Sequence, residues 1–240
     1  MLNNLNLAEL LTFPIKDAEA RKNFLIITLV YFLSFIVPIL PLLAAIGYTA
    51  RIMREIVAGC SARMPAWDDW ESMFKDGLIL FGVRLVYAIP ILVVFVPLFL
   101  GMAFLPFWFE SSGGSDGQFA VIFLLFGLAM LFIFPLSLAL GIIVPAAEVH
   151  TAIQNDFTAG FRFREWWPIF RANWVGFLLA YLIAMVGSMV LSTIVSIAMM
   201  TIILFCVVPF IMPAITAYLT LVMYAAFAQA YKDGKDRLPQ

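Results

Sequence analysis

Residues 174–231 read WVGFLLAYLIAMVGSMVLSTIVSIAMMTIILFCVVPFIMPAITAYLTLVMYAAFAQAY, and no charged side chain interrupts them. An α-helix needs about 20 apolar residues to cross the hydrocarbon core of a bilayer. The run is therefore long enough for two crossings, and we expect a tight turn between them near Met199–Thr201. So long an uncharged stretch points to a membrane, where helices satisfy their own backbone hydrogen bonds.

Three further uncharged runs lie upstream, at residues 24–50, 85–109 and 117–147. The whole chain is 64% hydrophobic and only 12% charged, whereas a typical soluble domain has about 25% charged residues. The runs at 85–109 and 117–147 each predict one crossing. The fold class is therefore an all-α integral membrane protein with four spanning helices.

The run at 24–50 carries Pro38 and Pro41 near its middle. A proline inside a helix removes a hydrogen bond and clashes with the preceding turn. Two arrangements fit this pattern: one kinked crossing, or a re-entrant or short helical hairpin with the prolines at its tip. We favour the hairpin, because basic residues flank the run at both ends.

Lysine and arginine lie only within residues 16–84 and 162–237, whereas Glu110 and Asp116 are the only charges around the loop at 111–117. Cytoplasmic loops of membrane proteins carry an excess of basic residues. This distribution predicts a multi-pass protein of the inner (cytoplasmic) cell membrane with both termini in the cytoplasm.

Three segments mix aromatic or leucine side chains with charges and are expected to lie in the headgroup layer: Asn6–Phe13, Pro65–Asp76 and Phe161–Asn173. The second is predicted to begin as a helix at Pro65 and to stop at Gly77.

We predict a single membrane domain over residues 1–240. Its parts are an interfacial N-terminal segment (1–23), a hydrophobic hairpin (24–58), an interfacial helix (62–77), a spanning helix (78–107), an outside loop (108–118), a spanning helix (119–147), a cytoplasmic or interfacial loop (148–173), two spanning helices (174–198 and 202–230) and a polar tail (231–240).

The candidate binding residues fall in two of these polar segments and beside the first apolar run. Interfacial tryptophans and arginines contact lipid headgroups or partners, although the same residues also simply anchor a helix or set its topology. Arg51 and Glu55 have the spacing of a helical ion pair, and the adjacent Asp68 and Asp69 point about 100° apart and make a poor catalytic or metal-binding pair. The partner- or lipid-binding candidates are Arg51, Arg54, Trp67, Asp68, Asp69, Trp70, Arg162, Arg164, Trp166 and Trp167.

Arg84, Glu148 and His150 are the ionisable residues within or at the ends of apolar runs. Such residues indicate a functional site by default. Arg84 is close enough to the predicted cytoplasmic edge to extend its head group to water or to pair with Glu148. The alternative is a polar pathway lined by Arg84, Tyr87, Glu148 and His150. For Glu148 and His150 the simpler role is at the end of a helix.

The segment RKNF at 21–24 enters one apolar run and RANW at 171–174 enters another, and each run later carries two prolines. Two helical hairpins, each preceded by an interfacial segment, would be a duplicated unit.

The block GYTARIMREIVAGCSARMPAWDDWESMFKDGL, residues 47–78, resembles the signature of domain-of-unknown-function family 4013. The matching features are Gly47-Tyr48, the arginines three apart, Pro-x-Trp-Asp-Asp at 65–69 and Phe-x-Asp-Gly at 74–77. Elements at 13–17, 161–165 and 228–231 also look like this family, although Cys60-Ser61 follows Gly59 where an acidic residue is more usual. The resemblance implies a polytopic membrane protein of bacteria or archaea and no particular activity.

No phosphate-binding loop, zinc-protease motif, serine-hydrolase motif or paired-cysteine motif occurs in the sequence. We therefore expect no enzyme, cofactor or metal site, and the absence of a basic tract argues against nucleic acid. The expected function is a scaffold or accessory subunit that binds a protein partner or lipids at its cytoplasmic face. Membrane lipids are the expected partners, with a membrane-protein complex or homo-oligomer. The alternative function is a small-molecule or lipid transporter or channel.

Overall fold

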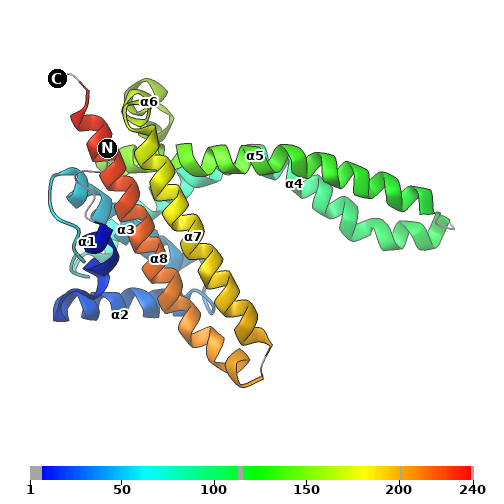
Figure 1. Ribbon diagram of the computed structural model, residues 1–240, viewed down its shortest axis with the longest axis horizontal. Helices are drawn as coiled ribbons and strands as arrows, with labels where there is room; N and C mark the ends of the chain where they lie inside the picture. The colour runs from blue at the N-terminus through cyan, green and yellow to red at the C-terminus, as the bar shows by residue number, and fades with distance from the viewer. Residues whose placement is uncertain (1–6, 113–115, 201, 239–240) are drawn as a thin grey trace. The chain divides into compact units, whose positions relative to one another are not determined.

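The computed structural model describes residues 7–112, 116–200 and 202–238, which form helices and turns with no strand among them (Figure 1). The elements are α1 (Leu7–Thr12), η1 (Phe13–Ile15), α2 (Ala18–Leu33), α3 (Ile39–Val57), α4 (Trp70–Ser112), α5 (Asp116–Gln154), η2 (Phe157–Phe161), α6 (Phe163–Ala172), α7 (Trp174–Met199) and α8 (Ile202–Asp236). The all-α class is confirmed.

Four helices within the described residues are long and apolar enough to cross a membrane, at Trp70–Phe104, Phe123–Gln154, Trp174–Met199 and Val207–Asp236. This confirms the expected membrane fold. The break between α7 and α8 falls where the turn was predicted.

The chain divides into two compact units. Unit 1 contains Met1–Val83 and Pro145–Gln240, and unit 2 contains Arg84–Val144. Helices α4 and α5 each contribute one end to unit 1 and the remainder to unit 2. The single membrane domain stays a prediction.

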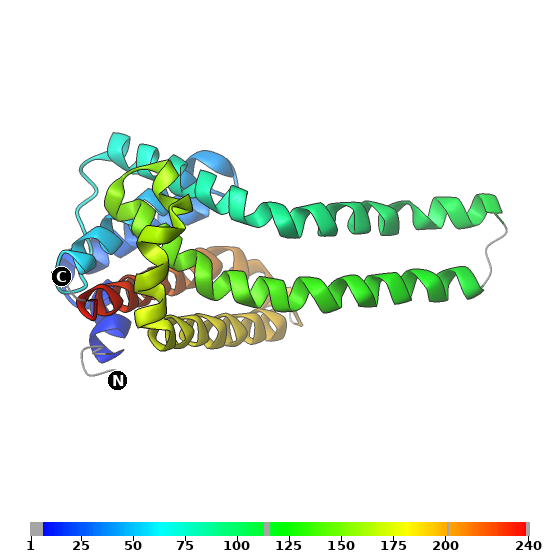
Figure 2. The same cartoon turned by 90° about the horizontal axis from the view of Figure 1, so that it is seen from above.

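In unit 1, α2 and α3 form an antiparallel hairpin (Figure 2). The Asp17 carboxylate caps α2 by accepting from the Ala20 amide at 2.7 Å, and Pro38 precedes the first turn of α3. The Asn23 side chain donates to the Met64 carbonyl at 3.3 Å, so the segment after α3 returns to the start of α2. The apolar part of α2, residues 24–33, is about 15 Å long at 1.5 Å per residue, roughly half of a bilayer core. Re-entry of this hairpin into the membrane stays a prediction.

Helices α3 and α4 touch backbone to backbone at two glycines. A Cβ atom on Gly47 would lie 1.8 Å from the Met73 carbonyl oxygen, and one on Gly77 would lie 1.9 Å from that of Leu43. Small residues allow such close approach of helices. The helix bounds differ here from the sequence prediction: α4 begins at Trp70 rather than Pro65, and it continues through Gly77. Gly77 serves helix packing and does not end the helix.

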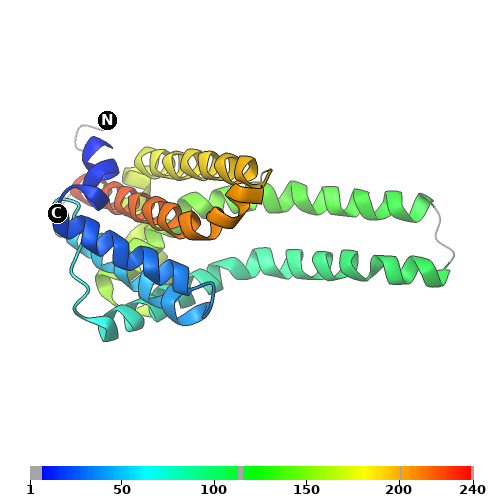
Figure 3. The same ribbon diagram turned by 90° about the horizontal axis from the view of Figure 1, so that it is seen from below.

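Helix α8 packs against α2, α3 and α7 in unit 1 (Figure 3). One face of α8 is fully buried through Ala217, Leu221, Ala225 and Ala228. The Phe177 and Phe227 rings lie 6.3 Å apart between α7 and α8. These small and aromatic side chains form the core that holds the polar ends of the helices in place.

Unit 2 has a different character. Among its described side chains, Ile133 alone is classed as buried. Large apolar side chains such as Phe104, Leu131 and Phe132 are exposed. Exposure of so much apolar surface is unfavourable in water, so unit 2 requires an apolar environment.

Candidate functional site

Tyr48 and Trp67 connect α3 to the loop that precedes α4. Their rings stack with centroids 4.2 Å apart, and the Tyr48 hydroxyl donates to the Pro65 carbonyl at 2.8 Å. The Trp67 indole donates to the Asn23 carbonyl at 3.3 Å. Trp67 is therefore engaged in the fold, whereas Trp70, with its ring 5.0 Å from that of Trp67, remains exposed.

Arg51 also binds the segment before α4. Its Nη1 donates to Asp68 Oδ1 at 2.7 Å and to the Ala66 carbonyl at 3.2 Å. The hydrogen bond from Arg51 holds the pKa of Asp68 below its ordinary value. The expected Arg51–Glu55 pair is wrong, because the loop brings Asp68 to Arg51 and Arg63 to Glu55, with Arg63 Nε 2.8 Å from Glu55 Oε2. Spacing along one helix did not reveal these loop partners.

The neighbouring carboxylate, Asp69, has a separate structural role. Its Oδ1 accepts from the Ser72 amide at 3.1 Å. A side chain that bonds to the amide three residues on caps a helix start, and this bond explains why α4 begins at Trp70.

Arg54 joins the ends of three helices. Its Nη1 lies 2.6 Å from Asp76 Oδ2 on α4, and its Nε donates to the Ala152 carbonyl in the last turn of α5. The Asp76 side chain is only 4% exposed. A buried carboxylate is stable when paired and hydrogen-bonded, so Arg54 and Asp76 fix α3, α4 and α5 together.

His150 makes a second junction, between α5, α6 and α8. Its Nδ1 lies 2.7 Å from the Tyr231 hydroxyl and its Nε2 lies 3.0 Å from Glu165 Oε2. His150 and Tyr231 are buried, and Glu148 is buried one half-turn away on the same helix. This hydrogen-bonded chain ties the start of α6 to the bundle.

The remaining candidate residues lie on α6 or just before it, and some of them are buried or paired within unit 1. Trp166 is fully buried and its indole donates to the Gly160 carbonyl at 3.1 Å. Arg162 is bound to Asp156 at 2.6 Å. A hydrogen bond from the Thr158 hydroxyl, together with the nearby Arg162, lowers the pKa of Asp156.

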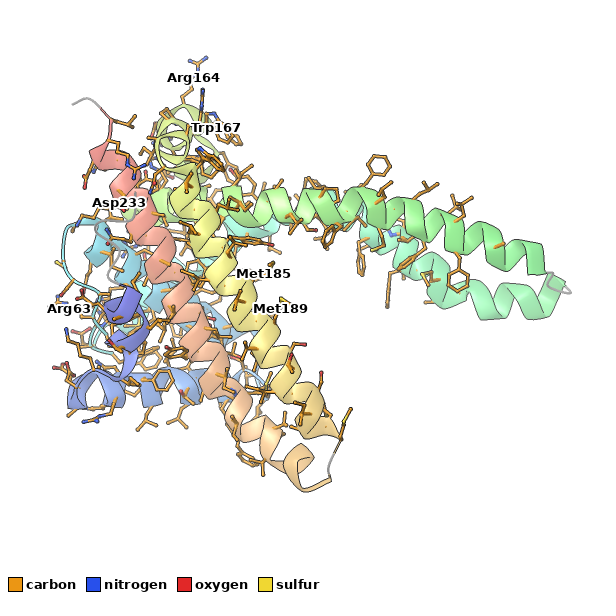
Figure 4. The ribbon with its side chains drawn as sticks, in the orientation of Figure 1. Arg63, Arg164, Trp167, Met185, Met189 and Asp233 are labelled. Carbon is orange, nitrogen blue, oxygen red and sulfur yellow. The ribbon has the colours of Figure 1, made fainter. Side chains whose placement is uncertain are left out.

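The outward face of α6, which we name the α6 surface, consists of Phe163, Arg164, Trp167 and Arg171. All four are exposed, Trp167 by 38%. Their spacing puts them on one side of the helix. Figure 4 shows Arg164 and Trp167 on the outer side of α6. Within the described residues, Arg164 and Arg171 make no hydrogen bond or ion pair through their side chains, so both charges are free to meet a ligand.

Among the residues that the structure adds to the candidate set, four connect helices: Asp76, Glu165, Asn173 and Tyr231. Asn173 is buried and donates to the Ala230 carbonyl at 2.9 Å, just as Asn23 donates to Met64. The similarity of RKNF and RANW was a usable signal for Asn173. The other three depend on contacts between distant segments and carry no local signal.

The predicted polar pathway is not assembled within one unit. Arg84 and Tyr87 belong to unit 2, whereas Glu148 and His150 belong to unit 1. The pathway and the Arg84–Glu148 pair stay predictions. No cluster of three or more histidine, cysteine or acidic side chains suited to a metal ion occurs in the part of the chain that the structure describes.

Comparison with protein families gives a match, over residues 29–200, to the family described as "Protein of unknown function (DUF4013)". The match includes α3, the loop before α4, and α6. No curated protein and no solved structure matches the chain.

Proposed function

This chain belongs to the DUF4013 family, and we propose that it is a non-enzymatic membrane scaffold whose α6 surface binds anionic lipid at one face of the bilayer. The proposal also places the lysine- and arginine-bearing segments of the chain on that face. The observation that carries the proposal is the pair of free arginines, Arg164 and Arg171, on the same exposed helix face as Trp167 and Phe163.

The direction of α6 supports contact with the membrane surface. In Figure 1, α6 is seen nearly end-on whereas α7 is seen from the side, so the two helices lie crosswise. If α7 crosses the bilayer, a helix that lies crosswise to its start runs parallel to the membrane plane, so α6 would lie along the headgroup layer. Tryptophan is enriched in this layer and arginine is attracted to its anionic lipids, and the α6 surface carries both kinds of side chain.

The chemistry of the α6 surface favours a lipid over a soluble partner. Tryptophan is enriched at the membrane boundary, and each arginine or lysine near an anionic leaflet contributes about 1 kcal/mol of attraction. Helix α7 begins only two residues after α6, which keeps the α6 surface at the level where the chain enters the membrane.

The rest of the charged network supports a scaffold rather than a catalyst. Arg51, Arg54 and His150 each bond to groups from other parts of the chain. These bonds hold helix ends in fixed positions. A rigid polar head of this kind presents the α6 surface in one orientation.

The test measures anionic lipid retained by the purified full-length protein. The protein is exchanged from mixed phosphatidylglycerol and phosphatidylcholine into mild detergent, and bound lipid is counted by native mass spectrometry. We expect wild type to retain phosphatidylglycerol preferentially, and Arg164→Gln with Arg171→Gln to lose this preference by on the order of tenfold.

The matched control removes two positive charges elsewhere, with Lys75→Gln and Lys232→Gln, and should keep the wild-type preference. An equal loss of the phosphatidylglycerol preference in the control would mean that the effect comes from net charge and not from the α6 surface. A double α6 variant with undiminished lipid, or one that instead loses a co-purifying protein, would contradict the lipid assignment.

A further inference from the structure

A polar cavity of about 470 Å³ lies in unit 1 beside the start of α2. Its walls come from η1 and the first turn of α2, from the last turns of α3, and from the loop at residues 61–66. Ligand pockets in proteins usually measure about 300–1,000 Å³. The cavity is large enough for a small polar ligand, and it is separate from the α6 surface in sequence.

The charges around this cavity are balanced in sign. Its charged lining residues are the basic Lys16, Arg51 and Arg63 and the acidic Asp17, Glu19 and Glu55. A cavity for a simple anion or a simple cation would carry an excess of one sign. Equal numbers of both favour a ligand that itself carries a positive and a negative group.

Several of these groups retain bonding capacity. Lys16 and Glu19 are exposed and form no ion pair within the described ranges. Arg63 uses Nε for Glu55, and its two terminal nitrogens have no partner among the residues that the structure describes. An ammonium, a guanidinium and a carboxylate can therefore bind a ligand without breaking the fold.

The cavity lies at the boundary between polar and apolar chain. Helix α2 becomes apolar at Phe24, and the exposed Leu25 and Leu29 follow within about three turns of Glu19. Leu11 and Ile15, just before the cavity residues, are exposed as well. Exposed apolar side chains on both sides of a charged cavity are the surroundings of a lipid headgroup.

We propose that this cavity binds the phosphoethanolamine group of a membrane lipid. Lys16 and Arg63 bind the phosphate, and Glu19 accepts hydrogen bonds from the ammonium. Phosphatidylcholine has no N–H on its head group and cannot donate to Glu19. Phosphatidylglycerol has no positive charge and would bring its phosphate close to an unbalanced carboxylate.

The test is competitive lipid binding to the full-length protein in nanodiscs of phosphatidylcholine. Small amounts of phosphatidylethanolamine or phosphatidylglycerol are added in separate arms, and soluble phosphoethanolamine is added in a third. Wild type should take up phosphatidylethanolamine through this cavity, in addition to the phosphatidylglycerol that the α6 surface binds. Lys16→Gln with Glu19→Gln should reduce the phosphatidylethanolamine uptake by on the order of tenfold and leave the phosphatidylglycerol uptake unchanged.

The control variant carries Lys22→Gln and Asp236→Asn, which remove one charge of each sign outside the cavity, and it should bind as wild type does. Three outcomes would overturn the proposal: a loss of phosphatidylglycerol uptake equal to the loss of phosphatidylethanolamine uptake in the Lys16 and Glu19 variant, no effect of the Lys16 and Glu19 changes, or binding of soluble phosphoethanolamine with no uptake of the lipid. The α6 surface is unchanged in these variants, so the phosphatidylglycerol arm reports on the proposed scaffold function and the phosphatidylethanolamine arm reports on the cavity.

Discussion

Unit 1 buries many of its large side chains in a core, whereas the large side chains described in unit 2 are mostly exposed. Trp166, Tyr48 and Phe177 are fully buried in unit 1, while in unit 2 Phe132 and Phe134 are 72% and 67% exposed. The charged residues differ in the same way. Buried ion pairs and hydrogen bonds connect helices in unit 1, and the apolar helices of unit 2 carry almost no charge between Leu85 and Val144.

This difference indicates two separate sources of stability. Unit 1 is held by its own tertiary contacts, so its side chains are sensitive to substitution. Unit 2 is held by helix hydrogen bonds and by apolar surroundings, in which lipid replaces a protein core. Substitutions in the two units should therefore differ sharply in cost.

The largest expected difference is at the glycines. Gly47→Ala would place a Cβ atom 1.8 Å from the Met73 carbonyl oxygen, so α3 and α4 must separate, at a cost of about 3 kcal/mol or more. Gly101→Ala and Gly127→Ala in unit 2 meet no atom within 4 Å and should be neutral or stabilising by up to about 1 kcal/mol. Unfolding in mixed micelles measures all three. Equal cost in both units would contradict the comparison.

Large aromatic side chains provide the second test. Trp166→Ala should cost about 3–5 kcal/mol, because it leaves a cavity in the core and removes the bond to Gly160. Phe132→Ala should cost little, since the side chain lies outside any core of unit 2. Thermal unfolding in detergent compares them. A large loss of stability in Phe132→Ala would mean that another protein surface covers unit 2.

A smaller effect is expected at the ion pairs of unit 1. Asp76→Ala leaves Arg54 without its buried partner and should cost about 3 kcal/mol. Asp68→Ala breaks an exposed pair with Arg51 and should lower the unfolding midpoint only slightly. If the two variants were equally stable, the Arg54 junction would not be what holds the three helix ends.

The smallest effect concerns pH and Asp156. Its pKa in the folded protein lies below the ordinary value of 3.8, so the carboxylate stabilises the fold above pH 3.8 and loses this contribution as the pH falls through the lowered pKa. Asp156→Asn should therefore lower the unfolding midpoint slightly at pH 7 and have no effect in strong acid. If the difference in unfolding midpoint between Asp156→Asn and wild type grew as the pH fell, the prediction would be contradicted.

The sequence predicted the elements whose signals are local. Uncharged length located the four apolar helices and the turn after Met199, because hydropathy depends on neighbouring residues alone. The aromatic and charged patterns located the regions of α1 and α6. The predicted helix start at Pro65 is wrong, because Asp69 caps α4 at Trp70. The segment before Asp69 is held by hydrogen bonds from Tyr48 and Arg51 instead.

The sites were predictable only in part, for a physical reason. Residue type identified Trp67, Arg54 and Trp166 as candidates, but the structure ties each of them to its own chain. Whether an arginine or tryptophan is free to bind depends on its tertiary partners, which spacing along the chain does not encode. Arg164 and Trp167 are distinguished only by their outward position on α6.

The most direct test of the account is the sidedness of the charged residues. Three proteins with a single cysteine each are compared, all carrying Cys206→Ser. The first keeps the exposed native Cys60. The other two carry Cys60→Ser together with either Arg164→Cys or Ser112→Cys. A membrane-impermeant maleimide is applied to right-side-out and inside-out vesicles. The account predicts that positions 60 and 164 react from the cytoplasmic side and position 112 from the opposite side. Reaction of positions 60 and 164 from opposite sides would contradict it.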